Sequence, residues 1–190
     1  MNIQILSGIF LMLSIGISAQ DEIDYNPKAL HSELGKLSDA SDPLLLEIQI
    51  PKSLADKNPI QGKYFALDYQ QGDSPISFIY VGRVNSCRAG GCLASPEKKE
   101  TGLSEYFDYF VLFDKETVVR QVKVYNYQAT HGQEITAKGW LKQFVGYNGN
   151  QALRVGKEID GISGATISVY GITADIEGKC LLLKEILVKN

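Results

Sequence analysis

The pattern of apolar and polar residues along the chain predicts a series of short strands. Runs rich in β-branched and aromatic residues, bounded by Pro, Gly, Asp or Ser, are typical of strands. Such runs occur at residues 44–50, 63–69, 76–84, 106–113 and 118–127. The last two are separated only by a short charged segment, which indicates an antiparallel hairpin over residues 106–127.

Other segments show helical spacing. The polar segment 21–43 contains a short helical pattern. Its apolar positions are Leu30, Leu34 and Leu37. A second short helix is predicted over residues 136–145, with Thr136 as its N-cap and Gly146 at its end.

The longest helix is predicted from about Ser168 to Val188, because its apolar residues recur every three or four positions and so form one stripe. That stripe consists of Ile172, Ile176, Cys180, Leu183 and Leu187. Strands come first and helices later, without regular strand–helix alternation. This order predicts an α+β fold with an antiparallel sheet packed by helices. The 190 residues are enough for one well-packed core.

The first residues have the features of an export signal. Residues 3–19 carry no charge, and the apolar run 9–17 is too short to span a bilayer comfortably. Small residues at Ser18 and Ala19 suit cleavage. We therefore expect a signal peptide over residues 1–19, a periplasmic or otherwise extracytoplasmic location of bacterial type, and no stable membrane insertion after cleavage. A retained N-terminal anchor is the alternative.

Charge and composition exclude several classes of protein. The net charge is −3 and no basic run occurs, which argues against general nucleic-acid binding. Ten Tyr and seven Phe argue against a disordered chain. Three Cys are too few for a small protein held together by disulfides. Dinucleotide-binding, P-loop and hydrolase-elbow motifs do not occur in the sequence.

The cysteines have separate expected roles. Cys87 and Cys92 lie in a Gly-containing loop, where an oxidising compartment favours a local disulfide. The alternative that assigns them a function is a redox-active cysteine pair, in which the charge of Arg88 favours the thiolate form. Cys180 is predicted to be a buried thiol. With only two His in the chain, we expect no metal site.

The stretch 160–168 is the candidate for chemistry. Ser163, Gly164 and Ala165 add little bulk just before the long helix, and Thr166 contributes a hydroxyl. The first N–H groups of a helix lack intrahelical acceptors, and the helix dipole favours an anion there. A phosphate at Thr166 would therefore be well placed. The plainer interpretation is that Ser163 or Thr166 only caps the helix.

These residues resemble a family motif. Asp160, Ser163, Gly164, Ala165 and Thr166 match D-x-x-S-G-A-T, a signature of FMN-binding domains such as those in the C subunit of sodium-translocating NADH:quinone reductase and the G subunit of the Rnf complex. The resemblance implies FMN as cofactor, joined to Thr166 by a phosphoester bond that an extracytoplasmic flavin transferase makes from FAD. It also implies that the transferase recognises Asp160 and Ser163, and that the backbone of Gly164 and Ala165 surrounds the phosphate.

The resemblance covers about residues 105–178. Within it, W-x-x-x-F-x-G follows the family's order. These residues are Trp140, Phe144 and Gly146. The loop 129–134 differs from the family's E-T-P-G-L-G, of which it keeps only Thr130 and Gly132.

Further cofactor contacts are expected around the motif. The candidates are Ile167, Thr130, His131 and Gly132. His131 either donates a hydrogen bond near the flavin or faces solvent. Trp140, Tyr147 and Tyr170 either stack on the flavin ring or belong to the core.

Together, these observations predict three parts: the signal 1–19, an unassigned N-terminal part 20–104 and an FMN-binding domain 105–190. The expected function is extracytoplasmic electron transfer with no catalytic residue of the protein's own, and the redox partner is not indicated. The alternatives are a reductase with noncovalent FMN, a cofactor-free binding module, and a thiol redox protein that uses Cys87 and Cys92.

Overall fold

A computed structural model describes most of the chain. The described residues are 22–37, 42–58, 60–72, 74–86 and 105–189. The predicted signal peptide over residues 1–19 and the cysteines Cys87 and Cys92 lie outside them.

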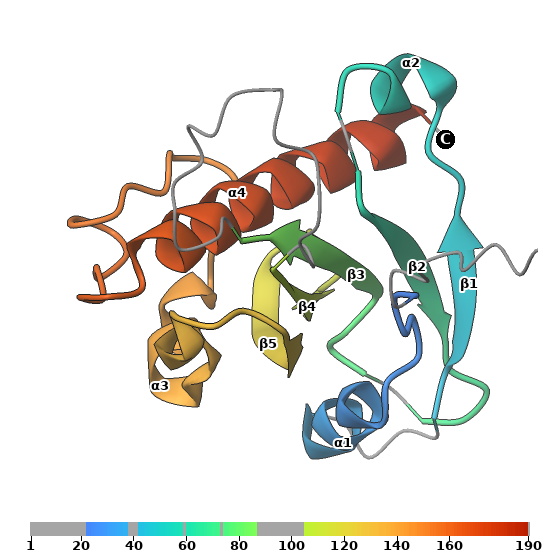
Figure 1. Ribbon diagram of the computed structural model, residues 1–190. Coiled ribbons are helices and arrows are strands. Elements are labelled where there is room, and N and C mark those ends of the chain that lie inside the picture. Colours follow the sequence, from blue (N-terminus) through green and yellow to red (C-terminus); the bar gives the residue numbers. More distant parts are fainter. Residues whose placement is uncertain (1–21, 38–41, 59, 73, 87–104, 190) are drawn as a thin grey trace, which may run out of the picture.

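Five strands form one antiparallel sheet in the order β1-β2-β3-β4-β5, so neighbours along the chain are neighbours in space (Figure 1). The strands are β1 Leu44–Ile48, β2 Gly62–Asp68, β3 Phe78–Asn85, β4 Tyr106–Phe113 and β5 Val119–Tyr127. All five predicted strands and the hairpin are confirmed. The sheet is continuous between the two halves of the chain, because β3 and β4 pair along their whole lengths.

The strand β4 lies in the middle of the core. All of its residues are buried, since both faces of the sheet are covered. Phe107, Tyr109 and Val111 point to one face and Phe110 and Leu112 to the other. This is why its sequence is a continuous apolar and aromatic run rather than an alternating one.

The long helix α4 Thr166–Lys189 covers one face of the sheet, and α1 Lys28–Leu37 lies on the opposite side (Figure 1). The α+β class is therefore confirmed, with a helix on each side of the sheet.

The apolar stripe of α4 is confirmed in part. Its first four residues are fully buried, and Cys180 is among them, as predicted. Leu187, the last residue of the predicted stripe, is 36% exposed, whereas its neighbour Ile186 is buried. A regular spacing of apolar residues does not show where along a helix its packing partners change.

The predicted helix over residues 136–145 is broken into three short pieces. These are the 3-10 helix η1 Gln133–Thr136, the helix α3 Lys138–Leu141 and the 3-10 helix η2 Lys142–Phe144. Thr136 is not the N-cap: it ends η1, and Ala137 has an extended backbone before α3. The N–H of Ala137 donates to the carbonyl of Glu134, which closes the turn and interrupts the helix. A further short helix, α2 Lys52–Ala55, follows Pro51 and was not predicted.

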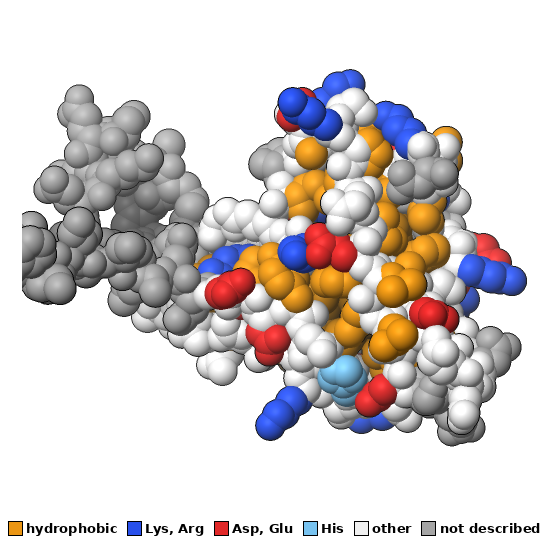
Figure 2. Space-filling view, turned by 90° about the vertical axis from the view of Figure 1, so that its right-hand side faces the viewer, with side chains coloured by type: hydrophobic (Ala, Val, Ile, Leu, Met, Phe, Trp, Pro, Cys, Tyr) orange, Lys and Arg blue, Asp and Glu red, His pale blue; other side chains and the backbone are white. Residues whose placement is uncertain are grey.

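The strand β1 forms an edge of the sheet. It pairs with β2 alone among the described residues, and it exposes Leu44 and Leu46. Figure 2 shows this side of the molecule, where apolar side chains gather between charged ones. No helix within the described part of the chain has both the length and the apolar character needed to cross a bilayer.

The helix α1 is held to the sheet by a buried carboxylate. Glu33 is 4% exposed and accepts hydrogen bonds from Lys123 on β5 (2.8 Å) and from Lys36 (2.9 Å). Burial raises the pKa of Glu33, but the two lysines outweigh it and hold that pKa below its ordinary value. The charged form is therefore the one that the fold favours.

We expect this carboxylate to stabilise the fold in a pH-dependent way. Because its pKa is lower in the folded than in the unfolded chain, the stabilisation is complete at neutral pH and is lost as the pH falls through the folded-state pKa. Glu33→Gln should lower the free energy of unfolding by about 1–2 kcal/mol at pH 7. The difference from the wild type should shrink in acid, as measured by urea unfolding across pH.

The matched control is Glu47→Gln. Glu47 pairs with Lys63 at 2.8 Å, but both side chains are about 40% exposed, so the loss should be below about 0.5 kcal/mol. Equal losses in the two variants would contradict the role given to Glu33.

Candidate functional site

The stretch 160–165 forms a loop that leads into α4. Ser163 and Gly164 make a turn, closed by a hydrogen bond from the N–H of Ala165 to the carbonyl of Ile162 (3.1 Å). Ala165 is 2% exposed and packs in the core, whereas Ser163 and Thr166 are exposed. The buried methyl group thus anchors the loop and leaves the two hydroxyls at the surface.

The hydroxyls of Ser163 and Thr166 have no hydrogen-bond partner among the described residues. Neither therefore caps α4 with its side chain. In the same part of the chain, the backbone N–H groups of Thr166, Ile167 and Ser168 also lack acceptors, and the first bond into the helix runs from Val169 to the carbonyl of Ala165. Three open N–H groups at the positive end of a helix dipole fit a phosphate.

Gly164 has a φ of +83°, in the left-handed region. A Cβ at this position would meet no atom within 4 Å, so the position requires glycine for its backbone conformation and not for lack of room. The open space in front of the backbone is also what a phosphate needs in order to approach it.

Replacing Gly164 should therefore cost stability through the backbone alone. We expect Gly164→Ala to lower the free energy of unfolding by about 1–2 kcal/mol. Gly178→Ala is the matched control, because Gly178 lies inside α4 with nothing near its added Cβ. It should raise stability by about 0.5–1 kcal/mol. Urea unfolding of both variants checks the sign, and a stabilising Gly164→Ala would contradict the strained turn.

The segment 130–132 lies against the first turn of α4. A Cβ on Gly132 would come within 2.6 Å of Ser168 Oγ. The hydroxyl of Tyr127 donates to the carbonyl of His131 (2.5 Å) and lies 3.1 Å from Ser168 Oγ. Two segments that the sequence analysis proposed separately, 130–132 and 163–167, are thus brought together at the start of α4.

The side chains of this segment have different surroundings. Thr130 donates its hydroxyl to Glu105. The ring of His131 is exposed, and in the described structure it makes no hydrogen bond. Gly132 is buried, with a φ of +89°. The observed link between this segment and the start of α4 runs through the His131 carbonyl, by way of the Tyr127 hydroxyl, and through the close approach of Gly132 to Ser168.

Asp160 is held through its backbone. The indole N–H of Trp140 donates to the Asp160 carbonyl (2.9 Å), and the Asp160 N–H donates to Gln143 Oε1 (2.8 Å). The Asp160 side chain is exposed. Trp140 therefore positions the loop before α4 and is not available for ring stacking, because it is 9% exposed and packs edge-on against Phe144.

The other two aromatic candidates differ. Tyr147 is 7% exposed and belongs to the core. Tyr170 is 57% exposed and lies one helical turn after Thr166. Ile167, also on the first turn, is 47% exposed. An apolar surface therefore begins directly beside the Thr166 hydroxyl.

The residues that sequence reasoning missed are Tyr127, Gln143 and Ser168. Each acts through a partner distant in sequence: Tyr127 and Ser168 are 41 positions apart, and Gln143 and Asp160 are 17 apart. No local pattern marks such pairs, although the short interval between Ser168 and the motif is a weak signal.

A buried ion pair joins β3 and β4 on the face of the sheet that does not pack against α4. Arg83 donates from Nε to Asp108 Oδ1 (2.6 Å) and from an Nη to Oδ2 (3.0 Å). Asn126 donates to the same carboxylate (2.8 Å), and the Tyr106 ring lies 3.5 Å from the guanidinium carbon. The hydrogen bond that Arg83 donates to the Asp108 carboxylate raises the pKa of Arg83 above its ordinary value.

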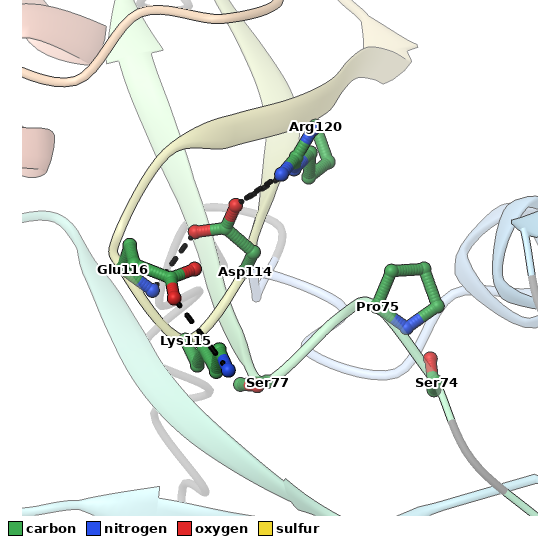
Figure 3. A pocket seen from close by; sticks show the side chains of 7 residues that line it. All are labelled: Ser74, Pro75, Ser77, Asp114, Lys115, Glu116 and Arg120. Carbon is green, nitrogen blue, oxygen red and sulfur yellow. Dashed lines mark hydrogen bonds and ion pairs between the residues drawn. The ribbon is translucent and has the colours of Figure 1, made fainter.

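A shallow pocket of about 420 Å³ lies at the turn between β4 and β5 (Figure 3). One of its two carboxylates, Asp114, is already engaged, because it accepts hydrogen bonds from the N–H groups of Glu116 and Val118 and pairs with Arg120. The same turn contacts Cys180, which is about 21 Å along α4 from Thr166. This pocket belongs to the hairpin turn and is remote from the Thr166 site.

Metal-binding side chains are not grouped in the described structure, where no three His, Cys, Asp or Glu residues could hold an ion together.

The region around Thr166 lies within a match to a known protein family. Residues 102–177 match the model of a protein family described as the FMN-binding domain. The match begins before β4 and ends within α4, so it includes the hairpin, the segment 130–132 and the turn before Thr166. No curated protein and no solved structure matches the chain.

Proposed function

We propose that this chain, whose residues 102–177 are an FMN-binding domain, carries FMN as a phosphoester of Thr166 and transfers electrons outside the cytoplasm. The observation that carries the proposal is the Thr166 hydroxyl, which is exposed and without a hydrogen-bond partner in the described structure. It lies at a helix start with three open N–H groups.

Backbone groups at the start of α4 would hold the phosphate. The N–H groups of Thr166, Ile167 and Ser168 and the dipole of α4 favour its negative charge. Gly164 leaves room for it, and buried Ala165 keeps the turn in place. The donor set and the open space both fit the phosphate end of FMN.

Formation of the ester requires an accessible nucleophile and an external enzyme. The Thr166 oxygen would displace AMP from FAD, so that a threonine–phosphate bond replaces the diphosphate bond and the hydroxyl proton is lost. Ser163 and Asp160 are exposed in the loop that precedes Thr166, which leaves both side chains accessible to a flavin transferase. Bound flavin would supply the redox chemistry, while the protein supplies the tether and its surroundings.

Production of the full chain with an active flavin transferase and FAD tests this proposal. We expect yellow, fluorescent protein that keeps its flavin through denaturing gel electrophoresis, and an intact mass increased by FMN less one water. The same mass spectrum reports whether residues 1–19 have been removed.

Other outcomes would favour the alternatives. Flavin that binds the native protein but is lost on denaturation, with turnover of a substrate, would indicate a reductase with noncovalent FMN. Protein that stays colourless in the presence of transferase and FAD would indicate a binding module without cofactor. Either result would overturn the covalent assignment.

A further inference from the structure

The strand β1 lies at the edge of the sheet, and the hydrogen bonds of β2 show which of its backbone groups face outward. In β2, Leu67 donates its N–H to the carbonyl of Ser77 (2.9 Å). The odd-numbered residues of β2 therefore direct their backbone groups to β3, and the even-numbered residues direct theirs to β1. The partners of the latter in β1 are also even-numbered, as for Leu46 opposite Ala66.

Leu45 and Glu47 consequently direct their N–H and C=O groups away from the sheet. No backbone group of a described residue bonds to them. The strand also lacks the features that protect an edge, because its register with β2 has no bulge and it contains neither Pro nor Lys. Open backbone groups on a regular strand are a template for pairing with another strand.

The side chains of β1 form an apolar row on the face of the sheet that α4 covers elsewhere. Ile48 packs against the core on that face. Leu44 and Leu46 lie on the same face, but they are 56% and 52% exposed, and they belong to the side of the molecule on which apolar side chains gather (Figure 2). Large apolar side chains that lie together at the surface indicate an interaction site.

The opposite edge of the sheet is already occupied. At the start of β5, the N–H of Val119 donates to the carbonyl of Tyr147 (2.8 Å), and its carbonyl accepts from the N–H of Gly146 (2.8 Å). Within the described part of the chain, β1 is therefore the edge that is open to pairing. A contact of β1 with a second copy of itself uses the open edge of both copies, so it closes as a dimer and does not extend into a fibre.

The charges around β1 favour a second copy of this chain as the partner. Asp42 precedes the strand and Lys52 follows it, and both are exposed. When two copies of β1 lie antiparallel, the acidic end of each is near the basic end of the other, so the charges are complementary. Within the strand, the charged residue is Glu47, whose carboxylate pairs with Lys63 of its own chain (2.8 Å).

One antiparallel register satisfies both the backbone and the charges. With Leu46 opposite Leu46 of the partner, Leu45 lies opposite the partner's Glu47, and the residues of each such pair exchange both backbone hydrogen bonds. A register shifted by two residues in one direction would place Glu47 opposite Glu47, where like charges repel. A shift in the other direction would place Glu47 opposite Pro43, which has no N–H to donate.

We propose that β1 pairs with β1 of a second copy of this chain in this antiparallel register, so that two five-stranded sheets join into one across a dimer. The contact uses no residue of the Thr166 site. The inference therefore goes beyond the proposed function and holds whether or not FMN is attached.

Analytical ultracentrifugation of the full chain tests the dimer. We expect a dissociation constant of about 10 µM, because two short strands form an interface at the small end of the specific range. Leu46→Lys places two cations opposite each other and should raise this constant at least about ten-fold. Leu181→Lys is the matched control, because Leu181 is a 40% exposed leucine on α4, and it should leave the constant unchanged.

A cysteine at position 46 tests the register. Directly opposite residues that are not hydrogen-bonded to each other have Cα atoms about 4.5 Å apart, which a disulfide can span. Leu46→Cys should therefore form a covalent dimer on mild oxidation, seen by non-reducing gel electrophoresis. Leu44→Cys is similarly exposed, but its two copies would be about 13 Å apart along the strands and should not cross-link.

A charge exchange tests the complementarity of the two ends. Lys52→Glu leaves acidic residues at both ends of β1 and should raise the dissociation constant about three-fold. Adding Asp42→Lys reverses both ends together and should restore the wild-type value. Lys157→Glu changes the net charge equally at an exposed position in the loop before α4 and should have little effect.

The contrary results are specific. Full chain that stays monomeric on both sides of the expected constant would overturn the proposal, and would indicate that β1 is covered by another segment or serves a different partner. A dimer that tolerates Leu46→Lys, or equal cross-linking of the two cysteine variants, would also overturn it. The cysteine pair decides the matter if Leu46→Lys fails to fold. Absence of covalent flavin would overturn the proposed function and leave the dimer standing.

Discussion

A Thr166→Ala variant produced with a flavin transferase and FAD is expected to carry no flavin after denaturation. Only the side-chain oxygen of Thr166 can form the ester, and alanine has none. The fold should be retained, because Thr166 is exposed and, within the described structure, its side chain makes no hydrogen bond. We expect a change of less than about 0.5 kcal/mol in the free energy of unfolding. Gel fluorescence and intact mass measure the attachment.

Three control variants separate attachment from local disruption. Thr166→Ser keeps a hydroxyl and should still accept flavin. Thr130→Ala removes another exposed hydroxyl, one that is bonded to Glu105, and should remain flavinylated. Ser163→Ala should lower the rate of attachment without abolishing it, since Ser163 is assigned to recognition. Covalent flavin on Thr166→Ala would show that another residue is the attachment site.

The largest expected effect on stability comes from the buried pair of Arg83 and Asp108. Asp108 is 1% exposed and Arg83 is 8% exposed. Asp108→Ala would leave the guanidinium buried without its carboxylate, which typically costs about 3–5 kcal/mol. That is a large fraction of the stability of an ordinary domain. Urea or thermal unfolding should show a correspondingly large fall in the midpoint.

Two comparisons test the cause of this loss. Asp56→Ala removes an exposed carboxylate and should change stability by less than about 0.5 kcal/mol. The double variant Arg83→Met with Asp108→Leu removes both charges and should recover much of the loss, because neither partner is left buried alone. A loss below about 1 kcal/mol for Asp108→Ala would contradict the view that this pair joins β3 and β4.

Local patterns predicted the parts of the fold that depend on neighbouring residues. The hairpin 106–127 is marked by two apolar runs around a charged turn, and β4 has the predicted bounds. The helix α4 was expected within two residues at its start and one at its end. Long periodic segments of this kind repeat the same signal many times, so a single exception does not hide them.

The errors lie where distant contacts override a local pattern. The segment 136–145 has helical spacing. Within it, Trp140 and Gln143 make hydrogen bonds with the backbone of Asp160, in the loop before α4. The segment forms short helical pieces instead of the single helix that its spacing predicts. Leu187 continues the apolar spacing of α4 but is partly exposed, because the buried side of the helix changes near its end.

The candidate site also has one part that local sequence indicates and another that only the fold brings together. The order of small residues and a hydroxyl before a long helix is local, so the sequence alone indicated Thr166 and the phosphate-binding character of the turn. The contact of the segment 130–132 with Ser168, through Tyr127 and Gly132, joins residues far apart in the chain. No pattern of neighbouring residues carries that information.

By itself, then, the sequence determined the strands, the long helix, the α+β class and the position of a hydroxyl at a helix start, because these depend on residue types within one or two turns of each other. Only the tertiary structure decided which surfaces meet. The sheet brings the end of β3, from the N-terminal part, against α4, where Val84 approaches Gly171. Packing between distant segments depends on the shape and charge of both segments at once. A local sequence pattern describes only one of them, so it does not show which other segment packs against it.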